Sequence, residues 1–152
     1  MNDTRNIQPT GADKIFNNAV RWLAKVGVSL YGTRLLAVKG RKSGQWRTTA
    51  VNPLTIDGET YLVAPRGHTQ WVRNMRVVGG GELRLGRKRQ TFTVTELADQ
   101  DKPDILRLYL KKWAWEVGKF FGEGISHESS EETLLGIAPG FPVFRLHLQS
   151  DK

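Results

Sequence analysis

The chain has 152 residues, of which 39% are hydrophobic and 25% are charged, a composition that fits one globular domain and excludes a low-complexity chain. Its 23 lysines and arginines outnumber its 15 acidic residues, so the net charge of +8 favours an anionic partner: nucleic acid, acidic lipid or a polyanionic small molecule. Cysteine is absent, which excludes disulfides and thiolate catalysis. We see no signal-type apolar core and no membrane-length apolar run, and we expect a cytoplasmic protein.

The first expected element is an amphipathic helix over residues 13–26, after a flexible stretch over residues 1–12. Its apolar positions share one face, and Gly27 ends it. In the common interpretation this helix packs on the core. Alternatively, its basic face makes a peripheral contact with an anionic membrane surface. We assign residues 13–150 to a single domain.

The next stretch predicts three strands. A short buried strand over residues 35–38 leads into a glycine-framed loop, and residues 47–56 form the strand that leaves it. Pro53 cannot donate to a ladder, so it predicts an edge position or a bulge. The Asp-Gly pair at 57–58 is the strongest hairpin signal of the chain, and it pairs this strand with residues 60–64.

The remaining elements alternate short strands with helices. In chain order they are a helix over 69–78, strands over 83–85 and 91–95, a helix over 101–121, a short helix opened by a capping box at 129–132, and a strand over 143–148. The long helix has one broad apolar face that includes Trp113. Leu108 and Trp115 fall on its other face, where they need a pocket, a subunit interface or solvent. The pattern predicts a mainly β, α+β fold in which the last strand completes a barrel.

Residues 40–49, which we call the glycine loop, concentrate positive charge and hydroxyl groups between two strands. Its two glycines let the backbone turn with N–H groups facing outward, as in a nest that binds phosphate or carboxylate. The side-chain donors beside them are Ser43, Arg47, Thr48 and Thr49. The alternative interpretation is a solvated basic turn without a ligand.

The residue sets of several mechanisms are missing. The three histidines are scattered without metal-ligand spacing, so we expect no metal site. There is no Walker A sequence and no Rossmann fingerprint, and Ser43 is not in a nucleophile elbow. The anion-binding loop and the tryptophans suit a planar ligand with an acidic tail. Trp46 lies in the loop and is expected to contact the ligand, whereas Trp71 lies on the apolar face of its helix and is expected in the core.

Three sequence stretches occur in a characteristic order. They are Gly-Arg-Lys-Ser-Gly-x-x-Arg-Thr-Thr at 40–49, Ala-Pro-Arg-Gly at 64–67 and Trp-Val-Arg-Asn-Met-Arg at 71–76. Together they resemble the deazaflavin-dependent nitroreductase family of coenzyme F420-linked oxidoreductases, and the likeness covers roughly residues 35–97. The resemblance implies a split β-barrel, similar to FMN-binding barrels, with flanking helices and with coenzyme F420 in a groove beside the barrel.

The resemblance also assigns roles to individual residues. Lys42, Ser43 and Arg47 would hold the phosphate of the cofactor, with Arg41 near its acidic tail and Thr48 and Thr49 as hydroxyl donors. Ala64, Pro65, Arg66 and Gly67 would line the deazaflavin ring, supported by Trp71, Asn74 and Met75. For the substrate pocket we expect Trp46, Trp113 and Trp115.

The chemistry that the resemblance implies is hydride transfer from the reduced deazaflavin to an electrophilic small molecule, such as a quinone or a nitroaromatic compound. No obligate acid or base is visible, so catalysis would rest mainly on the proximity of donor and acceptor. Two rivals stay open: an FMN-binding relative on the same barrel, and a non-catalytic basic barrel that binds nucleic acid. The basic residues gather in one loop and along helices, with few aromatic residues on strands, so no nucleic acid is expected.

Overall fold

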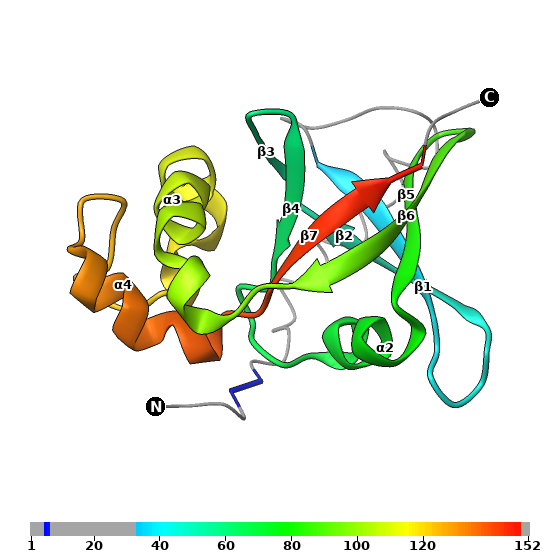
Figure 1. Ribbon diagram of the computed structural model, residues 1–152, viewed down its shortest axis with the longest axis horizontal. Helices are drawn as coiled ribbons and strands as arrows, with labels where there is room; N and C mark the ends of the chain where they lie inside the picture. The colour runs from blue at the N-terminus through cyan, green and yellow to red at the C-terminus, as the bar shows by residue number, and fades with distance from the viewer. Residues whose placement is uncertain (1–4, 7–32, 150–152) are drawn as a thin grey trace.

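The computed structural model describes residues 5, 6 and 33–149, and the helix predicted over residues 13–26 lies outside them. Within these residues, seven strands form one curled antiparallel sheet. In the view of Figure 1, α2 lies below this sheet, and α3 and α4 lie side by side to its left. The strands are β1 (Arg34–Lys39), β2 (Trp46–Val51), β3 (Leu54–Ile56), β4 (Glu59–Val63), β5 (Gly80–Leu85), β6 (Lys88–Glu96) and β7 (Val143–Leu148). The helices are α2 (Gln70–Val78), α3 (Pro103–Val117) and α4 (Glu131–Ile137), with 3₁₀ turns η1 (Asp99–Asp101), η2 (Gly118–Phe120) and η3 (Ala138–Gly140). None of the described helices is long and apolar enough to cross a membrane.

The strand order forces this sheet to curl. Along the sheet the order is β2-β1-β5-β6-β7-β4-β3, so β2 and β3 lie at its two ends. In a flat sheet, six spacings of about 4.7 Å would separate these strands by roughly 28 Å. Only residues 52 and 53 join Val51 to Leu54, however, and three peptide steps span at most about 11 Å. The two ends of the sheet therefore meet at this corner, as in the predicted split barrel.

The single strand predicted over residues 47–56 is wrong, because the structure has two strands there. β2 ends at Val51, β3 begins at Leu54, and Pro53 lies between them. Proline has no N–H to donate to a ladder, so the chain leaves β1 at this point and pairs with β4 at the other end of the sheet. The hairpin at 57–58 is confirmed, since Asp57 and Gly58 have φ values of 50° and 82°, both left-handed, as a type I′ turn requires.

Glycines in β5 allow the neighbouring strands to approach closely. A Cβ atom on Gly81 would lie 2.4 Å from the backbone oxygen of Ala37 in β1. A Cβ atom on Gly80 would lie 2.4 Å from the backbone oxygen of Phe92 in β6. Real Cβ atoms do not approach oxygen this closely, so the ladders on both sides of β5 depend on these two glycines.

Among the described residues, two apolar clusters form the core. The first occupies the barrel interior and contains Leu36, Val38, Val51, Leu62, Ala64, Val72, Met75, Leu83, Phe92, Phe144 and Leu146. The second lies where α3 and α4 pack on the barrel wall and includes Leu106, Tyr109, Leu110, Trp113, Val117, Phe121, Leu134 and Val143. The broad apolar face predicted for the long helix is therefore confirmed. Leu108, on the opposite face, is 38% exposed.

The last strand completes the barrel, as predicted. β7 lies between β6 and β4, so it joins the half of the sheet that contains β1 to the half that contains β3. Phe144 and Leu146 are buried on its inner face. Among the described strands, no other ladder joins the two halves, so the closed sheet depends on β7.

Candidate functional site

Residues 40–45 of the glycine loop join β1 to β2 as a tight turn, and its residues 46–49 belong to β2. The N–H of Gly40 donates to the Gln45 carbonyl at 2.8 Å, and the N–H of Gly44 donates to the Gly40 carbonyl at 2.9 Å. The Ser43 hydroxyl accepts from the N–H of Gln45 at 3.2 Å. No hydrogen bond among the described residues uses the backbone N–H of Lys42 or Ser43. The turn is thus fixed by its own bonds and leaves two consecutive N–H groups for an anion.

Helix α2 holds this turn in place. The side-chain oxygen of Asn74 accepts both the backbone N–H of Arg41, at 3.1 Å, and the Arg41 guanidinium, at 2.8 Å. The same guanidinium donates to the side-chain oxygen of Gln70 at 3.0 Å. Asn74 is only 5% exposed, so a buried amide fixes both the main chain and the side chain of Arg41. The Arg41 guanidinium therefore fixes the position of the glycine loop against α2.

A cavity of about 690 Å³ opens beside the glycine loop. Its volume lies within the range of about 300–1,000 Å³ that is usual for small-molecule sites. Its described lining combines the inner face of the barrel, the glycine loop, α2 and one side of α3. The lining residues are Asn6, Leu36, Val38, Gly40, Arg41, Lys42, Ser43, Arg47, Thr48, Thr49, Ala50, Val51, Asn52, Val63, Pro65, Arg66, Thr69, Gln70, Trp71, Asn74, Tyr109 and Val117.

Two cations of the loop have no acidic partner. Within the part of the chain that the structure describes, the side chains of Lys42 and Arg47 make no hydrogen bond and no ion pair, and both residues are exposed. Arg47 lies opposite Val38 in the ladder between β1 and β2, and Thr49 lies opposite Leu36. Directly opposed residues share one face of a sheet, so Arg47 and Thr49 lie on the face that lines the cavity.

The charge of the cavity lining has one sign. Among the described residues, the lining contains the basic side chains of Arg41, Lys42, Arg47 and Arg66, and no carboxylate or histidine. The described residues also contain no cluster of histidine and carboxylate side chains that could hold a metal ion. A concave site with four positive charges and no acidic residue suits a polyanion.

Residues 64–69 form a further wall of the cavity. The N–H of Ala64 donates to the Pro142 carbonyl at 2.9 Å, and the N–H of Gly67 returns to the Ala64 carbonyl at 3.1 Å. Pro65, Arg66 and Thr69 line the cavity. The Thr69 hydroxyl oxygen is buried without a hydrogen-bond partner among the described residues. An unpaired buried hydroxyl is unfavourable, so this hydroxyl is available to a polar atom of a ligand in the cavity.

The structure brings most of the predicted site residues together. The predicted residues that line the cavity are Arg41, Lys42, Ser43, Arg47, Thr48, Thr49, Pro65, Arg66, Trp71 and Asn74. Trp71, which the pattern placed in the core, is half-buried: its ring packs on Phe144 with centroids 5.8 Å apart while the residue also lines the cavity. Both expectations for Trp71 therefore describe part of its environment.

The structure differs from the prediction at two tryptophans of the expected substrate pocket. Trp46 lies opposite Lys39, and strand alternation turns it to the face away from Arg47. Its ring contacts the cations of Lys39 and Arg84, at 5.3 and 5.0 Å, and does not line the cavity. Trp113 is fully buried among α3 and α4, because the inward face of its helix packs there. The side chain of Trp115 lies outside the described residues, and its role stays a prediction.

Three further predicted residues lie next to the cavity without lining it. Met75 is fully buried in the barrel core, so it can support the wall but cannot touch a ligand. Ala64 and Gly67 are buried at the ends of the short turn whose middle residues, Pro65 and Arg66, face the cavity. Ala64 and Gly67 therefore fix the conformation of the turn without facing the cavity.

Some lining residues were missed by the sequence argument. Tyr109 and Val117 were placed on the core face of the long helix, but one side of that face reaches the cavity. Gln70 precedes Asn74 by one helical turn, and this spacing could have marked both as neighbours on α2. Asn6 is far from the cavity in sequence, and no pattern could have placed it there.

A family of known proteins matches this chain. The model of the F420H(2)-dependent quinone reductase family matches residues 15–117, more than half of the chain. No curated protein sequence matches this chain.

Solved structures share the fold at low sequence identity. The F420-H2 dependent reductase FDR-A is 18% identical, covers 76% of this chain and 94% of its own, and has a TM-score of 0.50. A protein described as a domain-swapped dimer is 18% identical over 91% of this chain and 100% of its own, with a TM-score of 0.54. A FAD-binding protein from Mesorhizobium loti is 12% identical over 88% of this chain and 89% of its own, with a TM-score of 0.51. These structures confirm the split-barrel fold, and the family match confirms the resemblance seen in the sequence. The chain belongs to the F420H2-dependent quinone reductase family and is an oxidoreductase that uses coenzyme F420.

Proposed function

We propose that coenzyme F420 binds in the cavity beside the glycine loop, with its acidic tail at the loop and its deazaflavin ring at the apolar end. The observation that supports this most strongly is the lining, in which four basic side chains and no carboxylate border the apolar inner face of the barrel. A phosphorylated, acidic tail requires the basic side chains, and a flat ring requires the apolar surface.

The residues present fit the tail of this cofactor. The side chains of Lys42 and Arg47 have no partner among the described residues, and the backbone N–H groups of Lys42 and Ser43 are likewise available. A guanidinium binds an oxyanion through two parallel hydrogen bonds, whereas an ammonium acts as a point charge. We therefore assign Arg47 and Lys42 to the phosphate. Arg41 already donates to Asn74 and Gln70, so we assign it to the loop rather than to the tail.

The opposite end of the cavity fits a ring with a few polar atoms. Pro65 and Trp71 supply apolar surface there, and the unpaired hydroxyl of Thr69 supplies a hydrogen bond. We place the electrophilic acceptor beside the ring, at the side bounded by Tyr109 and Val117 of α3. A quinone is the acceptor that the family favours, and a nitroaromatic compound is the alternative.

When bound in its reduced form, F420 supplies the hydride for the reaction. The chain's own residues bind the tail, hold the ring against the barrel and exclude water from the apolar end. Of the four cations, Arg66 lies on the wall that we assign to the ring, and its charge favours negative charge that develops on the acceptor. Among the described lining residues there is no carboxylate or histidine to act as a general acid, so positioning and electrostatics carry the rate.

Turnover with matched donors tests this proposal. The protein is mixed with reduced F420 or reduced FMN, together with a soluble quinone or a nitroaromatic compound, and oxidation of the donor is followed optically. We expect oxidation of reduced F420 that requires both protein and acceptor and is faster with the quinone. Acceptor reduction by reduced FMN and not by reduced F420 would instead assign the cavity to FMN.

A further inference from the structure

Arg5 makes an unusual set of contacts for a residue near the start of a chain. Its guanidinium donates to three backbone carbonyls: Gly140 at 3.0 Å, Pro65 at 2.5 Å and Phe120 at 2.6 Å. It also lies 4.2 Å from the centre of the Phe141 ring, a cation–π contact. Burial lowers the pKa of Arg5, because desolvation disfavours the charged form. The side chain thus connects three segments that are far apart in sequence.

The backbone of Arg5 and Asn6 is tied to the wall of the cavity. The carbonyl of Arg5 accepts the N–H of His68 at 2.7 Å, and Asn6 forms a β-bridge with Gly67. A Cβ atom on Gly67 would lie 2.2 Å from the Arg5 carbonyl oxygen, so only glycine allows this approach. These two residues belong to the stretch that the sequence predicts to be flexible, and here they pack against residues 65–68.

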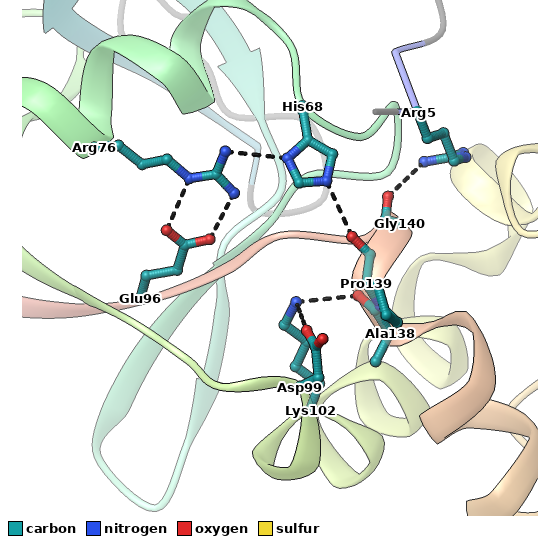
Figure 2. Close-up of polar contacts among 9 residues, drawn as sticks. All are labelled: Arg5, His68, Arg76, Glu96, Asp99, Lys102, Ala138, Pro139 and Gly140. Carbon is teal, nitrogen blue, oxygen red and sulfur yellow. Dashed lines mark hydrogen bonds and ion pairs between the residues drawn. The ribbon is translucent and has the colours of Figure 1, made fainter. Parts of the chain in front are cut away.

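The turn η3 accepts three side-chain hydrogen bonds, one of them from Arg5 (Figure 2). Each of its carbonyls accepts a hydrogen bond from a different part of the chain. The donors are Lys102 to Ala138 at 3.0 Å, His68 to Pro139 at 3.0 Å and Arg5 to Gly140 at 3.0 Å. Because carbonyls fixed in one turn cannot shift independently, Arg5 and His68 hold the cavity wall to a common anchor.

His68 is itself oriented from the other side. Arg76 donates to its Nδ1 at 3.0 Å, which leaves Nε2 as the protonated nitrogen that donates to Pro139. Arg76 is held by Glu96 through two bonds of 2.8 and 2.7 Å, and this pairing raises the pKa of Arg76. The wall is therefore fixed at His68 by α2 and β6, and at Pro65 by Arg5.

We propose that Arg5 is a positioning residue of the cofactor site. It does not line the cavity, but it holds Pro65 and the adjoining turn, which we assign to the deazaflavin ring. Loss of its guanidinium leaves the Pro65 end of this wall without its side-chain anchor, while the glycine loop keeps its own bonds to Asn74. The effect falls on the ring end of the cofactor and spares the phosphate end. This inference rests on the proposed location of F420.

The test compares Arg5→Ala with Arg5→Lys and with Arg107→Ala. Arg107 is a matched control, since its guanidinium donates to the His127 carbonyl at 2.7 Å and the residue does not line the cavity. Hydrogen exchange is measured for the ligand-free proteins. The exchange rates of the backbone amides of residues 66–69 are compared with those of the amides in β5 and β6. We expect about tenfold faster exchange at residues 66–69 in Arg5→Ala, partial recovery in Arg5→Lys, and no change in Arg107→Ala.

Binding then separates the two ends of the site. We expect Arg5→Ala to weaken F420 binding about tenfold and to leave the affinity for inorganic pyrophosphate unchanged. Unchanged exchange at residues 66–69, or faster exchange with unchanged F420 affinity, overturns the positioning role. Equal acceleration in β5 and β6 also overturns it, because Arg5 would then act on global stability. If the unaltered protein binds no F420, the proposed function fails, whereas the exchange of the ligand-free protein still reports whether Arg5 fixes the wall.

Discussion

Arg47→Ala is the substitution that most sharply separates ligand binding from folding. Arg47 is exposed and lies on the cavity face of β2, and its side chain has no partner among the described residues. A charge-assisted hydrogen bond contributes about 1.5–3 kcal/mol, and exposure places Arg47 near the lower value. Because 1.4 kcal/mol corresponds to a factor of ten, we expect the Kd for F420 to rise about tenfold.

The same substitution should leave the fold intact. No described contact is lost, so the free energy of unfolding should change by less than about 0.5 kcal/mol. For a chain of this size, that corresponds to a shift in Tm of at most about 2 °C.

The assay is a fluorescence titration of F420 at fixed ionic strength, with Arg87→Ala as the control. Arg87 lies in the exposed turn between β5 and β6 and does not line the cavity, so its substitution removes the same charge elsewhere. Equal weakening by both substitutions would mean that only overall charge matters. Unchanged affinity in Arg47→Ala would show that the phosphate lies elsewhere.

Four further substitutions test the framework of the fold and the site. Asn74→Ala leaves the Arg41 N–H unpaired, so we expect about 1–3 kcal/mol lower stability in urea and weaker F420 binding; normal binding would refute the anchoring role. Trp113→Ala should cost about 3–5 kcal/mol, with F420 affinity unchanged where the fold persists, and a changed affinity would return Trp113 to the pocket. Gly81→Ala should destabilise by about 1–3 kcal/mol in thermal unfolding, whereas Gly136→Ala in α4, with open space around it, should stabilise slightly. Equal effects of the two glycine substitutions would contradict the close approach of β1 and β5.

The parts of the site that sequence could predict are those encoded locally. The glycine loop combines its turn residues, cations and hydroxyls within ten consecutive positions, so its structure and its place between two strands follow from the pattern. The same holds for the hairpin at 57–58 and for the inward face of α3. In each case the sequence pattern and the structure that it predicts lie within the same short stretch of the chain.

The parts that could not be predicted depend on contacts between distant segments. The side-chain alternation of β2 decides that Arg47 faces the cavity and Trp46 does not, and a shift of one residue in register would reverse them. The fixed position of Arg41 depends on Asn74, and that of Pro65 depends on Arg5, which is 60 residues away. No periodicity in the sequence records such pairings.

The central claim is that the basic cavity beside the glycine loop binds coenzyme F420, and parallel titration with F420 and FMN tests it most directly. Quenching of cofactor fluorescence is measured for the unaltered protein and for Arg47→Ala under the same conditions. We predict saturable binding of F420, clearly weaker binding of FMN, and about tenfold loss of F420 affinity in Arg47→Ala. Tight binding of FMN without binding of F420 would contradict the account.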